Sequence, residues 1–346
     1  MTLHELDSEG DVLLTLHNPT APFAVWTESD TSPPENEPSA SGDTEPNGPS
    51  PVVEYLLSSR HLILASEYFR RTLRGPWKEG TVVHSDGRYH ISAEDWDETS
   101  MLTLMQIIHG RNREVPRWLN YEMIAKIAVL VDYYGCHEAV EIWSDIWIVE
   151  PEFVLRRICD RECILMILIT SIFKRESLFS MATNIALNNG TRHLPTLNLP
   201  ILTKAAEKVN QRREEYLTKI FDYLYGLRIL SSDDSIGCSF ECSSMLLGAL
   251  IVQMNQHGLL DSKPESPYAG HSIVSIMEMI RKLKTPEWSN TQRDKKEWNQ
   301  HWNDMPMPQK RVKLDTKYPE YHECSLSDLF NKNLNIWVEG LSLKDI

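Results

Sequence analysis

The chain has 346 residues, of which 41% are hydrophobic and 24% are charged, a balance typical of a globular protein with room for about two domains. Its formal net charge of -14 argues against nucleic acid as a direct partner, because phosphates would be repelled except at a local basic patch. Six cysteines are too few for a secreted disulfide scaffold, so we expect thiols in a reducing compartment.

The first 50 residues contain no lysine or arginine, and the opening Met1 to Glu5 lacks the pattern of a secretory signal. Asp11 to Leu16 and Val52 to Leu57 have the length and alternation of strands. Between them, residues 28–51 are dense in Pro, Ser, Glu and Asp, a composition that cannot bury enough apolar area to fold. We therefore expect two strands separated by a disordered acidic insertion.

Helical spacing follows from Leu62 to Leu73, and Thr81 to Ile91 then has the pattern of a strand or hairpin with its turn at Asp86-Gly87. Three helices complete this half. The first is capped by Asp97 and stopped at Gly110, and the others cover Asn120 to Tyr134 and His137 to Val149. We expect the fold core to include five apolar residues at structural periods, Val12, Leu14, Leu62, Phe69 and Leu73.

The second half is helical in pattern up to Leu230. Cys163 to Phe173 is its most apolar stretch, but a helix of that length would reach only about 16 Å against the ~30 Å of a bilayer core, so we expect a buried helix and no membrane partner. An amphipathic stripe runs from Ala206 to Leu227. Further helices are expected at Ser243 to Leu260, at Ser272 to Lys284 and in the tail after Ser325, with a long surface loop at residues 289–318.

Sequence motifs for catalysis are missing. The chain has no phosphate-binding loop, dinucleotide fingerprint, Gly-x-Ser-x-Gly elbow or His-Glu-x-x-His, so we expect no enzyme activity and no cofactor. The strongest metal candidate is a set of four residues, Cys238, Cys242, His322 and Cys324, whose types suit zinc although their spacing is atypical. Packed thiols without metal are the expected state of these cysteines, with zinc as the alternative.

A short basic run, Lys310, Arg311 and Lys313, lies in the predicted surface loop and resembles a monopartite nuclear import signal. The alternative is a solvated charged loop. We expect the protein in the nucleus or the cytoplasm, with the nucleus favoured by this run.

Several segments resemble a BTB/POZ domain of the type abundant in filamentous fungi. The most characteristic are Ser58 to Phe69, Trp77 to Gly80, Ile107 to Arg111, Ile124 to Tyr134 and Trp143 to Ile148. The predicted order of two strands, two helices, a strand and three helices agrees with that fold. Later segments, Pro264 to Ser272, Leu283 to Trp288 and Val338 to Leu341, resemble the helical companion region of the same proteins.

The resemblance implies an α+β BTB/POZ domain at about 1–150 and a mostly α-helical carboxy-terminal region at 151–346. It implies a non-enzymatic protein-protein interaction module that acts by self-association, as a homodimer, or by docking of a partner. Two alternatives are a substrate adaptor for a cullin-type ubiquitin ligase and a nuclear regulator acting through partners. Ser58-Ser59 replaces the usual His and basic residue before the first helix, which weakens dimerisation, and Gly110 to Asn120 lacks a hydrophobic-x-Glu step, which weakens cullin docking.

Overall fold

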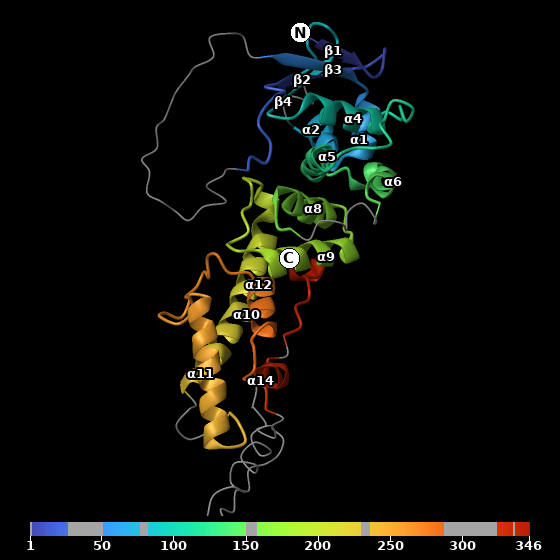
Figure 1. Ribbon diagram of the computed structural model, residues 1–346. Coiled ribbons are helices and arrows are strands. Elements are labelled where there is room, and N and C mark those ends of the chain that lie inside the picture. The colour runs from blue at the N-terminus through green and yellow to red at the C-terminus, as the bar shows by residue number, and fades with distance from the viewer. Residues whose placement is uncertain are drawn as a thin grey trace, which may run out of the picture. The chain divides into compact units, whose positions relative to one another are not determined.

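The computed structural model describes residues 2–26, 51–76, 82–149, 158–229, 236–286, 324–334 and 336–346 (Figure 1). The chain forms two compact units. Unit 1 contains Met1–Arg213, Ala269–Ser272 and Val338–Ile346, and unit 2 contains Glu214–Tyr268 and Ile273–Trp337.

A small sheet lies at the amino-terminal end of unit 1. Its order is β1-β3-β2-β4, with β2 antiparallel to β3 and the outer strands β1 and β4 each parallel to their neighbour. In β2 the side chains alternate between buried and half-buried, so one face of the strand enters the core. The strands are β1 (Thr2–Glu5), β2 (Val12–His17), β3 (Val52–Leu57) and β4 (Tyr89–Glu94).

Helices pack against this sheet in the predicted order (Figure 1). Asp97, Asn120 and Ser66 each accept a backbone hydrogen bond at a helix start, and Gly135 takes the left-handed conformation at a helix end. The five predicted core residues are all buried. The helices are α1 (Ser59–Ala65), α2 (Glu67–Arg74), α4 (Glu98–Ile108), α5 (Tyr121–Tyr134) and α6 (His137–Trp147).

The turn predicted at Asp86-Gly87 is confirmed: residues 84–88 form it, with Gly87 at φ +80°, and β4 follows from Tyr89. No strand forms in the described residues 82–88. Strand β1 was not expected at all. Its four residues are mostly exposed and show no alternation, so only pairing with β3 defines it.

The core of unit 1 continues from the sheet helices into α8 (Arg161–Ile172) and α9 (Glu176–Asn189). Every residue of α8 from Cys163 to Thr170 is buried, which confirms the expected buried helix. This helix packs between α5 and α9 and therefore leaves no polar face. No helix in the described residues is long and apolar enough to cross a membrane. Two short 3-10 helices, η2 (Pro200–Leu202) and η4 (Leu343–Asp345), also belong to this unit.

The secondary structure of the described part of unit 2 consists of helices joined by loops. Helix α10 (Thr203–Ile229) enters it at Glu214 and buries Leu217, Ile220 and Leu224 of the predicted stripe. The hydroxyl of Tyr223 donates to the carbonyl of Leu329, 2.9 Å away. The other helices are α11 (Phe240–Gln256), α12 (Ile273–Arg281) and α14 (Leu326–Asn333).

Helix boundaries in this unit differ from the predictions for local reasons. Helix α11 begins at Phe240 rather than Ser243, because Ser239 caps it, and the tail helix stops at Asn333. The predicted insertion at 28–51, apart from Pro51, and the predicted loop at 289–318 lie outside the described residues. A boundary at residue 150 stays a prediction, and unit 1 itself extends to Arg213.

Candidate interaction surface

Helix α6 carries apolar side chains on two of its faces. The inner face buries Val140, Trp143 and Trp147. On the outer face Ile142 is 73% exposed, and Ile146, one helical turn further on, is exposed as well. Val149, which is also exposed, follows two residues after the helix ends at Trp147. We call Ile142, Ile146 and Val149 the α6 stripe.

The fold holds α6 at both ends. Gly135, at φ +60°, makes the tight turn from α5, a conformation that side chains other than glycine rarely adopt. At the other end the indole Nε1 of Trp147 donates to the carbonyl of Pro116 at 2.8 Å. Arg175 donates to the Ser144 hydroxyl at 2.9 Å and forms an ion pair with Asp145. The α6 stripe is therefore presented on a fixed helix.

Acidic groups border the α6 stripe. Glu138 and Glu141 are both exposed on the same helix. The segment that accepts the Trp147 hydrogen bond also carries Trp118, whose side chain is 72% exposed. An apolar line beside exposed carboxylates suits a partner surface that is apolar with basic groups at its rim.

A groove of about 570 Å³ opens elsewhere on unit 1, between α2, β4 and the end of α5. Tyr68 and Tyr133 line it with ring centroids 5.3 Å apart, and Arg71 and Asp132 place charges in its wall. Strand β4 forms one side of the groove and is an outer strand of the sheet among the described strands. The groove therefore combines aromatic and charged groups in one wall.

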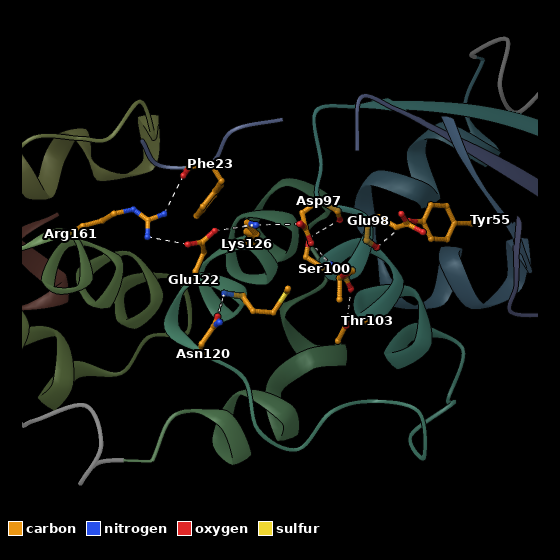
Figure 2. A network of polar contacts seen from close by, with 12 residues as sticks. Phe23, Tyr55, Asp97, Glu98, Ser100, Thr103, Asn120, Glu122, Lys126 and Arg161 are labelled. Carbon is orange, nitrogen blue, oxygen red and sulfur yellow. Dashed lines mark hydrogen bonds and ion pairs between the residues drawn. The ribbon is translucent and has the colours of Figure 1, made fainter. Parts of the chain in front are cut away.

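A chain of alternating charges connects α4, α5 and α8 (Figure 2). Lys126 lies 3.2 Å from both Asp97 and Glu122, and Arg161 lies 3.1 Å from Glu122. Arg161 also donates to the carbonyls of Ala24 and Phe23, at 2.8 and 3.2 Å. Figure 2 shows these side chains pointing toward one another between the helices. The network ties the segment after β2 to α5 and α8.

Two pKa shifts in this region follow from the same contacts. Burial alone would raise the pKa of Glu122. The hydrogen bond from Lys126 and the charge of Arg161 lower this pKa by more than burial raises it, so the net shift is downward. Burial raises the pKa of Tyr55, with Glu98 and Asp97 adding to the shift, while its hydroxyl donates to the carbonyl of Glu98. Glu122 thus stays charged, and Tyr55 stays protonated, near neutral pH.

Some of the site residues predicted from the sequence lie together in the structure, and others lie outside the described residues. Lys310, Arg311 and Lys313 lie outside the described residues, so the import signal stays a prediction. Of the four metal candidates, Cys238, Cys242 and Cys324 come together, with their sulfur atoms within 4.8 Å of one another. His322 lies outside the described residues.

The α6 stripe was not predicted from the sequence. A signal was present, because Ile142 and Ile146 lie one turn apart on a helix whose core face is already supplied by Val140, Trp143 and Trp147.

Neither the protein-family models nor the curated proteins with which the chain was compared give a match. The molecule is an α+β protein with a small four-stranded sheet at its amino-terminal end and helices through most of the remaining described chain.

Proposed function

We propose that this chain is a non-enzymatic interaction protein of the BTB/POZ type, which docks a partner protein on the α6 stripe. The observation that carries the proposal is the exposure of two apolar residues one turn apart on a fixed helix, Ile142 and Ile146, with Val149 exposed just beyond the end of that helix. Contiguous exposed apolar surface on a folded protein marks an interaction site more often than scattered single residues do.

The energetics favour a helix-sized contact. Full burial of an exposed aliphatic side chain contributes roughly 1.5–3 kcal/mol, so Ile142, which is 73% exposed, supplies more of the gain than Ile146, which is 39% exposed. Losses of rotational freedom and side-chain entropy on binding offset part of this gain. The segment that accepts the Trp147 hydrogen bond also exposes Trp118, a large aromatic side chain of the kind found at interface centres.

The charges favour a different protein over a second copy of this chain. A symmetric contact through α6 would bring two acidic surfaces together, each with exposed Glu138 and Glu141, and like charges across an interface oppose association. The partner should instead carry an apolar groove or helix with lysine or arginine at its rim. Binding should then weaken as salt concentration rises.

The test compares tagged full-length chains recovered from cells, with bound proteins quantified by mass spectrometry. The variant is Ile142→Asp with Ile146→Asp, and the control is Leu64→Asp, because Leu64 is 80% exposed on α1 and lies outside the α6 stripe. A second control, Ile142→Leu with Ile146→Leu, keeps the apolar surface.

We expect a protein that the wild type and both controls retain and that the aspartate pair loses at least tenfold. Recovery of a second copy of the chain instead would show self-association, and recovery of a cullin would identify an adaptor. If the aspartate pair retains every bound protein at wild-type level, the α6 stripe is not the docking surface.

A further inference from the structure

Three thiol groups meet in unit 2 from two segments that are far apart in the sequence. Cys238 and Cys242 stand at the start of α11, and Cys324 precedes α14. Their sulfur atoms all lie within 4.8 Å of one another. Cys242 is buried, Cys324 is half-buried and Cys238 is exposed, so the cluster lies at the surface with one side accessible to solution.

Local contacts fix the position of Cys242 in this cluster. Ser239 caps α11 by accepting a hydrogen bond from the backbone nitrogen of Cys242 at 3.2 Å, which fixes Cys242 in the first turn. Gly237 packs directly on the same side chain. A Cβ atom at position 237 would lie 2.5 Å from the Cys242 sulfur, so the close approach requires glycine.

The third thiol is held by the start of α14. The backbone nitrogen of Leu326 donates to the hydroxyl of Thr285 at 3.1 Å, and Ser325 caps the helix through the nitrogen of Asp328. Phe330 of the same helix packs edge-on against Tyr223 of α10, with ring centroids 5.6 Å apart. Cys324 is therefore anchored close to α11 by contacts that do not involve its sulfur.

The distances suit a tetrahedral metal ion. Zinc-sulfur bonds of about 2.3 Å place the sulfurs of a tetrahedral site about 3.8 Å apart. Side-chain adjustments of about 1 Å would close the cluster to that geometry. Three thiolates this close together would repel one another unless a bound cation compensated their charge.

We propose that Cys238, Cys242 and Cys324 bind one Zn²⁺ ion, which joins the start of α11 to the start of α14. Each cysteine releases its proton to solvent and forms one zinc-sulfur bond, so three protons leave as three bonds form, with no change of oxidation state. Water completes the tetrahedron. This inference replaces the expectation of packed thiols without metal.

The test uses the full-length chain, reconstituted with zinc under reducing conditions and freed of excess metal. We expect one zinc per chain by elemental analysis. Replacement by Co²⁺ should give the sulfur-to-metal charge-transfer band and the visible absorption of a tetrahedral thiolate site. Zinc should also raise the unfolding temperature of the chain, because it binds the folded state.

The variants are Cys238→Ser and Cys324→Ser, and the matched control is Cys159→Ser in unit 1. Cys238 is exposed, so its serine variant should keep the helical circular dichroism of the wild type. We expect both variants to bind zinc at least tenfold more weakly and the control to bind it as the wild type does. Absence of stoichiometric zinc in the wild type, equal binding by the Cys238 variant, or a disulfide within the cluster under these reducing conditions would overturn the proposal.

Discussion

Ser66 connects α1, α2 and the end of α5, and its replacement by alanine tests how these helices are joined. Its side chain is buried, caps α2 by accepting from the nitrogen of Phe69 at 3.1 Å, and donates to the carbonyl of Tyr134. That carbonyl ends α5 and has no donor within its own helix. The single hydroxyl therefore satisfies two backbone groups at once.

The expected loss follows from these two roles. Removal of a cap costs about 1 kcal/mol, and a buried carbonyl left without a donor costs about 1–3 kcal/mol more. Ser66→Ala should thus destabilise unit 1 by about 2–4 kcal/mol. Asn120→Ala is the matched control, because Asn120 caps α5 through an exposed hydrogen bond to the nitrogen of Met123, and it should cost only about 1 kcal/mol.

The assay is urea unfolding of the full-length chain, combined with hydrogen exchange of peptides from α2 and α5. Exchange separates unit 1 from unit 2, whose unfolding need not coincide with it. The midpoint for unit 1 should fall further for Ser66→Ala than for Asn120→Ala. Equal shifts for the two variants would show that the bond to Tyr134 adds nothing beyond the cap.

Three further predictions concern other parts of the chain. Arg161→Met should lower the free energy of unfolding of unit 1 near pH 7. The difference from the wild type should shrink as the pH falls through the lowered folded-state pKa of Glu122, because the ion pair contributes only while that carboxylate is charged. Urea unfolding at pH ~7 and ~3 checks this. Gly340→Ala should destabilise the folded chain by about 3 kcal/mol, since its Cβ would lie 1.7 Å from a backbone oxygen. Gly248→Ala in α11 meets open space and should stabilise the folded chain by about 0.5–1 kcal/mol. Thermal unfolding measures both changes. Alanine at the three basic positions of the predicted import signal should move a fluorescently tagged chain out of the nucleus; equal distribution of variant and wild type would leave only a solvated loop.

The fold of the amino-terminal half could be predicted largely from local signals. Helix α5 begins and ends where Asn120 and Gly135 indicated, because a cap and a left-handed glycine act within a few residues. Strand β1 could not be predicted, since its identity rests on pairing with β3 some fifty residues away. The apolar composition of α8 predicted that this helix is buried. It did not predict that α8 continues the core of unit 1, because that depends on tertiary packing.

The candidate sites show the same division between local and distant information. Composition alone named Cys238, Cys242 and Cys324 as possible zinc ligands, but only the tertiary structure brings the sulfur of Cys324, just before α14, near the other two. For α6, the sequence places apolar residues on two faces of the helix and does not indicate which face the core covers. Burial of Val140 and exposure of Ile142 decide that question.

The central claim, that the α6 stripe docks a partner protein, is tested most directly by a photoreactive amino acid placed at position 142 of the full-length chain in living cells. A matched chain carries the same group at position 64, which is equally open to solvent. We predict that position 142 forms a discrete covalent adduct with one other protein and that Ile146→Asp in the same chain abolishes it. Identical adduct patterns from positions 142 and 64, or no adduct at position 142, would contradict the account.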